Sequence, residues 1–323
     1  MRYVEVRGVR VSVIGLGTWQ FGSREWGYGK EYADTVALDI TRRALDLGIN
    51  LVDTAEVYGF GRSERILGRA LAGRRDEAFI ATKLLPILPI GPIVEQRAAA
   101  SARRLGVKEI DLYQLHWPNP VVPLEATMRG MRRTQEDGLV RHVGVSNFGL
   151  GRWHQADRAL GGPVLSNQVE YSLVARRAEA KLLPWAQANE RIIIAYSPLA
   201  QGFLSARWDG KKMPGGVRST NALFLPENIE RGRVLLDALR DVAAAHDATP
   251  SQVALAWLVR KPNVVAIPGA SSVEQVERNA EAADLILTDD DNERLTHAAE
   301  AFEPISGPAS LPSMLWSRLV GRS

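Results

Sequence analysis

Short apolar segments alternate with longer helical segments along this chain, and this alternation constrains the fold more than any other feature of the sequence. The predicted strands run over residues 13–19, 50–55, 78–83, 110–116, 142–147, 164–169, 191–197 and 264–268. Most of them are continuously apolar, which is typical of parallel strands that are covered on both faces. We expect helices to begin after Thr249 and Ser272, because each hydroxyl precedes a glutamine by three residues, the pattern of a capping box.

Eight strands that alternate with helices predict an α/β protein whose sheet closes into a (β/α)₈ TIM barrel. An open, doubly wound sheet is the alternative, although no Gly-x-Gly-x-x-Gly motif follows the first strand. A single domain over residues 1–323 is expected, since such barrels grow beyond 250 residues by loop insertions. Residues 2–11 are predicted to form an N-terminal β-hairpin at the bottom of the barrel. Two long C-terminal loops, 205–226 and 304–323, are candidates for lids over a site.

The composition excludes several classes of protein. Apolar residues make up 46% of the chain and charged residues 24%, so a full core needs no help from metals or disulfides. Cysteine is absent, which removes thiolate nucleophiles, disulfides and thiolate metal sites. The formal charge is only +3, and the arginines are scattered as on solvated helix faces, so no nucleic-acid partner is expected. No signal peptide and no run of 18 apolar residues occurs, which favours a cytoplasmic protein with no membrane contact.

Polar side chains close the second to the seventh predicted strand, where a buried strand would not choose them. These strand-end residues are Asp53, Lys83, His116, Asn147, Gln168 and Tyr196. In a barrel they would ring the C-terminal mouth, where such folds place their catalytic groups. Singly, each has an ordinary structural explanation as a cap, a solvated strand end or a hydrogen-bonded core residue. Together with Tyr58, they suit proton transfer to a carbonyl oxygen, and they offer neither the thiols nor the paired carboxylates of a metal or glycosidase site.

At these residues the sequence resembles the aldo-keto reductase family, from about residue 15 to about residue 279. Seven matching segments occur in order: Gly15-Leu16-Gly17-Thr18-Trp19, Asn50-Leu51-Val52-Asp53-Thr54-Ala55-Glu56-Val57-Tyr58-Gly59, Ala81-Thr82-Lys83, Asp111-Leu112-Tyr113-Gln114-Leu115-His116, Val143-Gly144-Val145-Ser146-Asn147-Phe148, Gln168-Val169-Glu170-Tyr171-Ser172 and Ala195-Tyr196-Ser197-Pro198-Leu199. So many ordered matches are highly specific. The resemblance implies reduction of a carbonyl by hydride transfer from a nicotinamide cofactor.

The resemblance also implies a catalytic tetrad of Asp53, Tyr58, Lys83 and His116. Tyr58 would protonate the carbonyl oxygen, and His116 would orient it. A free phenol titrates near 10, so poising Tyr58 near neutrality requires a downward shift of about three pKa units, or roughly 4 kcal/mol. We expect the Lys83 ammonium, held by Asp53, to supply much of that shift.

Cofactor contacts follow from the same resemblance. The nicotinamide end is implied at Gly17, Thr18, Trp19, Asp53, Ser146, Asn147, Gln168 and Tyr196, and the pyrophosphate at Ser197, Pro198, Leu199, Gln201 and Gly202. The adenosine 2′-phosphate segment is implied at Gly269, Ala270, Ser271, Ser272, Gln275, Arg278 and Asn279. Relatives usually have lysine or arginine near the positions of Ser271 and Ser272, so NADP(H) is the first expectation and NAD(H) the second. The missing basic charge could be compensated by Arg278, by Gln275 or by the free amides of a helix N-terminus at Ser272.

The substrate is expected to be a small-molecule carbonyl compound bound between aromatic walls, namely Trp19, Tyr28, Trp117, Phe148 and Trp316. Two other functions stay open. One is a nicotinamide-binding regulatory subunit similar to potassium-channel β subunits. The lack of a long N-terminal extension argues against this function. The other is an isomerase or lyase that uses Lys83 as a Schiff-base lysine, which the neighbouring Asp53 disfavours. The sequence is compatible with a monomer or a homo-oligomer.

Overall fold

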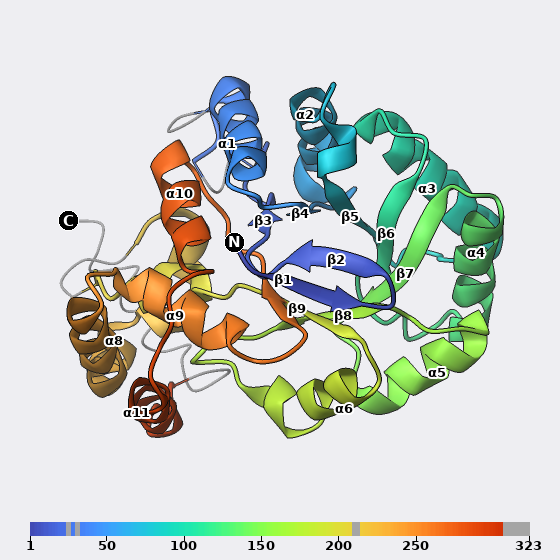
Figure 1. Ribbon diagram of the computed structural model, residues 1–323. Coiled ribbons are helices and arrows are strands. Elements are labelled where there is room, and N and C mark those ends of the chain that lie inside the picture. Colours follow the sequence, from blue (N-terminus) through green and yellow to red (C-terminus); the bar gives the residue numbers. More distant parts are fainter. Residues whose placement is uncertain (24–26, 30–32, 209–213, 306–323) are drawn as a thin grey trace.

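Eight parallel strands form one curved sheet in the computed structural model, which describes residues 1–23, 27–29, 33–208 and 214–305 (Figure 1). Each strand pairs with the next one along the chain. They are β3 (Leu16–Gly17), β4 (Leu51–Asp53), β5 (Phe79–Leu84), β6 (Ile110–Leu115), β7 (Val140–Ser146), β8 (Ser166–Glu170), β9 (Ile192–Tyr196) and β10 (Val264–Ala266). All eight fall within or beside the predicted segments.

Backbone contacts between the first and last strands of this sheet close it into a barrel. Parallel bridges join Ile14 to Ala266 and Gly17 to Gly269. The Gly15 N–H donates to the Ala266 carbonyl at 2.7 Å, and the Ala266 N–H donates to the Val13 carbonyl at 2.8 Å. Gly17 permits this closure, because a Cβ there would lie 2.6 Å from the Ile267 carbonyl oxygen. The predicted (β/α)₈ barrel is therefore confirmed, and the open-sheet alternative is wrong.

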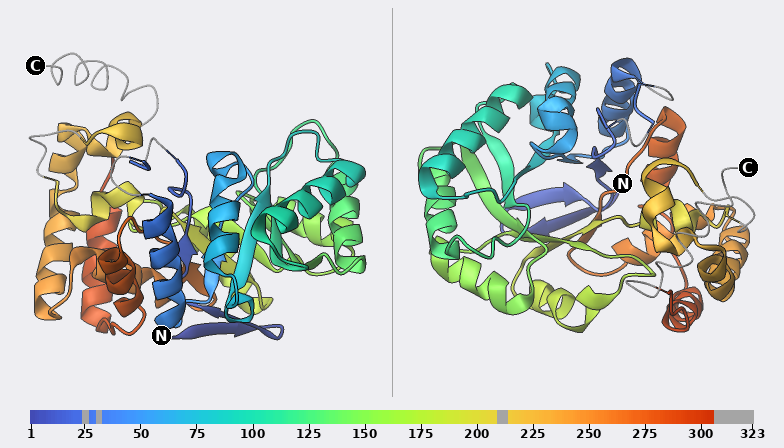
Figure 2. Two further views of the ribbon diagram at one scale, coloured as in Figure 1. Left: turned by 90° about the horizontal axis from the view of Figure 1, so that it is seen from above. Right: turned by 180° about the vertical axis from the view of Figure 1, so that it is seen from behind.

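Helices surround the strands on the outside (Figures 1 and 2). In chain order they are α1 (Asp34–Asp46), α2 (Arg62–Ala70), α3 (Gly91–Leu105), α4 (Leu124–Glu136), α5 (Leu150–Leu160), α6 (Leu182–Ala188), α7 (Pro226–Arg231), α8 (Arg233–Ala245), α9 (Pro250–Val259), α10 (Val273–Glu281) and α11 (Asp289–Glu300). Both predicted helix starts are confirmed. Thr249 forms the full capping box with Gln252, whereas Ser272 only accepts the Gln275 N–H, since the Gln275 side chain bonds Ser271 instead.

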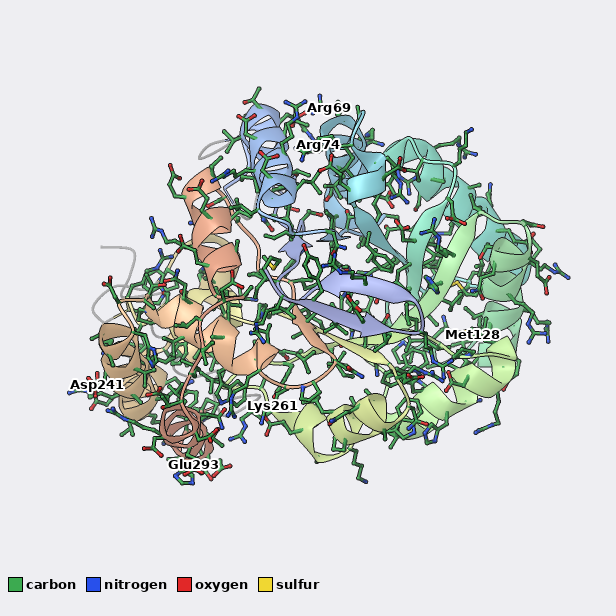
Figure 3. All side chains as sticks on the ribbon, viewed as in Figure 1. Arg69, Arg74, Met128, Asp241, Lys261 and Glu293 are labelled. Atoms are coloured by element: carbon green, nitrogen blue, oxygen red, sulfur yellow. The ribbon has the colours of Figure 1, made fainter. Side chains whose placement is uncertain are left out.

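The core lies within the barrel and between the barrel and its helices. Every residue of β4, β5, β6 and β10 is buried, as continuous apolar strands require. Trp153 and Trp257 are among the largest fully buried side chains, and each large apolar side chain stabilises the fold by about 1.5–3 kcal/mol. Figure 3 shows charged side chains such as Arg69, Asp241 and Glu293 on the outer surface of the helices. The core thus fixes the strands, and with them the residues at the strand ends.

The N-terminal hairpin consists of β1 (Tyr3–Val6) and β2 (Val9–Ser12), antiparallel with Tyr3 opposite Ser12. It lies across one end of the barrel, as predicted (Figures 1 and 2). The described part of the 205–226 insertion contains the 3₁₀ turns η6 (Gly216–Thr220) and η7 (Ala222–Phe224). The expected lid at the C-terminus, including Trp316, falls outside the described residues from position 306 onward. Within the described ranges, no helix has the length and apolarity needed to cross a membrane.

Candidate active site

A cavity of about 1260 Å³ opens at the carboxyl ends of the parallel strands. It is lined by the strand-end residues Asp53, His116 and Gln168, by Tyr58 from the segment after β4, and by the segment after β9. Every residue that was predicted to contact the cofactor lines this cavity except Ser272, which caps α10. The register of neighbouring parallel strands therefore brings distant parts of the sequence to one place.

Lys83 is the centre of the polar cluster at the base of this cavity. Its side chain is fully buried, and its Nζ donates to Asp53 Oδ1 at 2.5 Å, to the Thr54 carbonyl at 2.9 Å and to Tyr58 Oη at 3.2 Å. These contacts arise because β4 and β5 pair with Asp53 opposite Ala81, two residues before Lys83. The phenol and the ammonium are thus in direct contact, which is the condition on which a proton-donating Tyr58 depends.

Two sets of hydrogen bonds hold Asp53 in place. The second carboxylate oxygen of Asp53 accepts from Gln168 Nε2 at 2.7 Å, and the Asp53 carbonyl accepts from Thr18 Oγ1 at 2.9 Å. Ser63, at the start of α2, links the hydroxyls of Thr18 and Thr54 at 2.7 and 2.9 Å. All of these groups are buried, so each bond lies in a low local dielectric and restricts the carboxylate to one position.

The direction of the Tyr58 pKa differs from the sequence-based expectation. Burial raises the pKa of Tyr58, because the phenolate is poorly solvated, and the Lys83 ammonium lowers it by less. The net pKa lies above the ordinary value of a phenol, so the expected net downward shift is wrong for the free protein. Burial likewise raises the pKa of Asp53 against the opposing charge of Lys83. For Lys83 itself, burial is the largest single contribution and acts downward, but the charges and hydrogen bonds of Asp53 and Tyr58 together raise the pKa.

His116 is neutral in this environment. Burial, aided by the Lys83 charge, lowers the pKa of His116 to about 2. The imidazole stacks on Trp117 with ring centroids 3.8 Å apart, and the Tyr58 ring lies 6.0 Å away at its edge. Its Nδ1 is buried and has no hydrogen-bond partner among the described residues. A neutral ring with one N–H can donate one hydrogen bond without contributing a charge.

Asn147 and Tyr196 form the next part of the cavity wall. Asn147 has a left-handed backbone with φ of 62°, and its N–H donates to the Gln168 carbonyl at 2.9 Å. The Tyr196 hydroxyl donates to Asn147 Oδ1 at 3.0 Å. Ser146 Oγ donates to the Gln168 carbonyl at 2.9 Å. The ends of β7, β8 and β9 are therefore joined by side-chain bonds across the cavity wall.

Three arginines that sequence reasoning missed also line the cavity, and one of them, Arg62, begins α2. Arg207 and Arg218 belong to the long insertion after β9, and the Arg218 Nε donates to the Gln201 carbonyl at 2.8 Å. Gln201 and Gly202 have left-handed backbones, with φ of 57° and 98°. Arg207 and Arg218 do not lie at the end of a strand, so strand ends could not predict them. The only signal in the sequence was that they are basic residues within an insertion predicted to cover a site.

The far end of the cavity is lined by Ser271, Gln275, Arg278 and Asn279 around the start of α10. The Ser271 N–H donates to Gln275 Oε1 at 2.9 Å, and the Asn279 amide donates to the Gly269 carbonyl at 3.4 Å. Residues 249–252, the N-cap and first turn of α9, also line the cavity and were also missed. The capping-box pattern of this segment predicts a helix start and carries no signal for a cavity.

The expected aromatic walls are present in part. Trp19 and Trp117 line the cavity and are 41% and 43% exposed. Tyr28 and Phe148 are not among its described lining residues, and their side chains pack in the core with 5% and 2% exposure. Phe60, which was not predicted, does line the cavity and is 93% exposed. Tyr28 and Phe148 are thus corrected to core residues.

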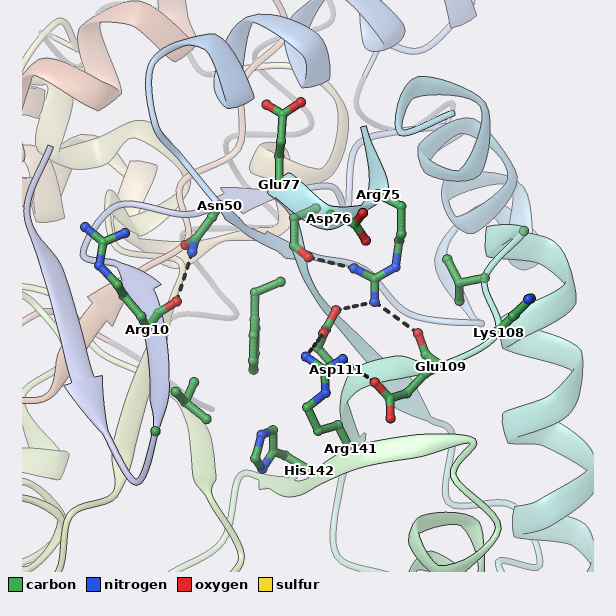
Figure 4. Close-up of a pocket in the computed structure, with 16 residues that line it drawn as sticks. Arg10, Asn50, Arg75, Asp76, Glu77, Lys108, Glu109, Asp111, Arg141 and His142 are labelled. Atoms are coloured by element: carbon green, nitrogen blue, oxygen red, sulfur yellow. Dashed lines mark hydrogen bonds and ion pairs between the residues drawn. The ribbon is translucent and has the colours of Figure 1, made fainter. Parts of the chain in front are cut away.

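A second cavity, of about 580 Å³, lies beside the N-terminal hairpin (Figure 4). Its most buried charge, Asp111, accepts from Arg75 at 2.5 Å, from Arg141 at 3.0 Å and from the Ile80 N–H at 2.9 Å. Figure 4 shows the two guanidinium groups converging on this carboxylate. Glu109 also pairs with Arg141, so the two carboxylates neutralise the two guanidinium groups, and we assign the candidate active site to the first cavity.

The chain matches the family model described as Aldo/keto reductase family over residues 13–300. It is 52% identical to an uncharacterized oxidoreductase of Mycobacterium tuberculosis (strain ATCC 25618 / H37Rv) across the full length of both chains. An NADH-specific methylglyoxal reductase of Escherichia coli (strain K12) is 30% identical, with 91% of this chain and 97% of that protein covered. The crystal structure of an aldo/keto reductase from Klebsiella pneumoniae in complex with NADP and acetate has a TM-score of 0.74 at 30% identity, covering 94% and 95% of the two chains.

Proposed function

The chain belongs to the aldo/keto reductase family. From this premise we propose that it reduces aldehydes or ketones to alcohols with a nicotinamide cofactor, and that NADP(H) is preferred over NAD(H). The observation that carries the proposal is the buried Lys83 ammonium in contact with both Asp53 and the Tyr58 hydroxyl at the base of the large cavity. A relative named as a methylglyoxal reductase supports a small carbonyl substrate.

In this reaction the Tyr58 hydroxyl gives its proton to the carbonyl oxygen, so that the phenol O–H bond breaks as the alcohol O–H bond forms. The Lys83 ammonium, 3.2 Å away, stabilises the negative charge that develops on the phenol oxygen. Asp53 keeps Lys83 protonated and in position. The nicotinamide supplies the hydride when it is bound. The neutral His116 donates its N–H to the carbonyl oxygen and orients it, without competing for the role of acid.

The residues of the cavity fit such a cofactor chemically. Because Gln168 Nε2 is committed to Asp53, the free Gln168 side-chain oxygen is an acceptor for the amide N–H of nicotinamide. Arg207 and Arg218 are cations suited to a pyrophosphate. A Schiff-base role for Lys83 is disfavoured, because its nitrogen is fully buried and donates three hydrogen bonds as an ammonium.

The pH profile of reduction should report Tyr58 and not His116. The proton donor must be protonated, and burial places the pKa of Tyr58 above its ordinary value. We therefore expect kcat/KM for reduction to stay level from about pH 6 to about pH 9 and to fall only at higher pH. Alcohol oxidation needs the phenolate, so it should rise with pH. Initial rates in both directions test this, and an inflection near pH 6.5 would assign the acid to His116 instead.

Arg278 is the cation that we expect to select the 2′-phosphate of NADP(H). It lines the far end of the cavity on α10, where Ser271 and Ser272 offer only hydroxyls. Arg278→Met should weaken NADPH binding by roughly tenfold, about 1.4 kcal/mol, and leave NADH binding unchanged, because NADH has no such phosphate. Fluorescence titrations with both cofactors measure the effect. Equal losses for the two cofactors would refute this role of Arg278, and tighter wild-type binding of NADH would make NAD(H) the cofactor of this chain.

A further inference from the structure

Phe60 combines two energetically unfavourable features. Its side chain is 93% exposed, the highest value among the large apolar side chains of the described residues. Its backbone is left-handed, with φ of 53° and ψ of 50°. Neither feature stabilises the folded chain, because an exposed ring gains nothing from burial and the left-handed region is strained for a bulky residue. Strain of this kind gathers at functional sites, where the surrounding structure enforces it.

The surroundings of Phe60 enforce its conformation. It stands between Gly59 and Gly61, whose backbones are also left-handed, with φ of 53° and 76°. The Phe60 N–H donates to the Val57 carbonyl at 3.2 Å, and the Phe60 carbonyl accepts from Arg65 Nη2 at 3.2 Å. The path of the chain is therefore fixed on both sides of the ring. As a result, Phe60 projects outward two residues after the proton donor.

The position of Phe60 connects it to the chemistry. It lines the cavity together with Trp19 and Trp117, and the Trp19 ring centroid lies 6.5 Å from that of Tyr58. Three partly or fully exposed aromatic rings thus line the cavity that also contains Tyr58. Flat apolar surfaces around a reacting group bind substrates that carry a flat apolar body.

We propose that Phe60 is a specificity-determining residue that packs against the body of the substrate, and that the preferred substrates are aldehydes or ketones carrying an aryl or similarly flat apolar group. This inference rests on the proposed function and deepens it by naming the substrate class. Small hydrophilic carbonyl compounds such as methylglyoxal reach Tyr58 but leave the Phe60 ring without a partner.

The test compares 4-nitrobenzaldehyde with methylglyoxal in wild type, Phe60→Asn and Phe60→Tyr. Asparagine tolerates the left-handed backbone and removes the ring, while tyrosine keeps an aromatic face. We expect Phe60→Asn to lower the ratio of kcat/KM for the aryl substrate to kcat/KM for methylglyoxal by about tenfold, chiefly through KM. Phe60→Tyr should retain the wild-type ratio. The thermal midpoint of Phe60→Asn should equal or exceed that of wild type, since no buried contact is lost.

A matched control is Ile286→Asn, which removes another exposed apolar side chain, 82% exposed, that is not among the described residues lining the cavity. It should leave the substrate ratio unchanged. An equal fall for both substrates in Phe60→Asn, or an unchanged ratio, would overturn the selectivity role. Failure of the proposed function looks different, since wild type would then turn over neither carbonyl compound.

Discussion

Replacing Tyr58 with phenylalanine is expected to lower the rate of carbonyl reduction by about 10² to 10⁴, the usual contribution of a general acid. The ring stays, so its packing against Trp19 and the edge of His116 is retained. Only the hydroxyl is lost, and with it the proton that the carbonyl oxygen needs and the acceptor of one Lys83 hydrogen bond. The loss should appear in kcat, because the phenol acts in the transition state and contributes little to binding of the ground state.

Two further measurements separate this effect from damage to the fold. Cofactor binding, followed by quenching of Trp19 and Trp117 fluorescence in the cavity, should be retained in Tyr58→Phe. Tyr113→Phe is the control, because it makes the same change at a fully buried tyrosine whose hydroxyl has no hydrogen-bond partner among the described residues. That variant should keep wild-type turnover. Substantial turnover in Tyr58→Phe would refute the assignment of the acid, and a wild-type protein that binds cofactor but reduces no carbonyl would favour a regulatory role.

The strand-end residues of the site were predictable from the sequence for a physical reason. Parallel strands in a barrel all end at one mouth, so a polar residue at the end of a buried strand has one place to go. Asp53 and Lys83 are 30 positions apart in the chain, yet the pairing of β4 with β5 brings them to 2.5 Å. No knowledge of the loops was needed for this contact.

Loop residues were predicted less well, because their direction depends on local backbone angles that the sequence pattern does not reveal. Phe148 follows Asn147, whose left-handed backbone belongs to the turn that carries Phe148 into the core instead of the cavity. Phe60 is exposed by the same kind of backbone. The sign of the Tyr58 pKa shift also depended on burial, which competes with the Lys83 charge and is known only from the structure.

Replacing Lys83 with methionine should destabilise the protein by about 3–5 kcal/mol as well as abolish activity, because it leaves the Asp53 carboxylate buried without its ion-pair partner. The side chains of Lys83 and Asp53 are 0% and 2% exposed, so water cannot replace the lost ammonium. Urea unfolding monitored by circular dichroism measures the change. Lys108→Met, at an exposed lysine, is the matched control and should change the free energy of unfolding by no more than about 0.5 kcal/mol.

The double variant Asp53→Asn/Lys83→Met distinguishes stability from catalysis. Removing both charges eliminates the unpaired carboxylate, and the amide still accepts the Gln168 hydrogen bond, so most of the lost stability should return. Activity should not return, because no cation then faces the Tyr58 oxygen when its proton leaves. Recovery of both properties would mean that Lys83 serves only to neutralise Asp53. Recovery of neither would mean that the pair also holds the backbone around Thr54, whose carbonyl accepts from the same ammonium at 2.9 Å.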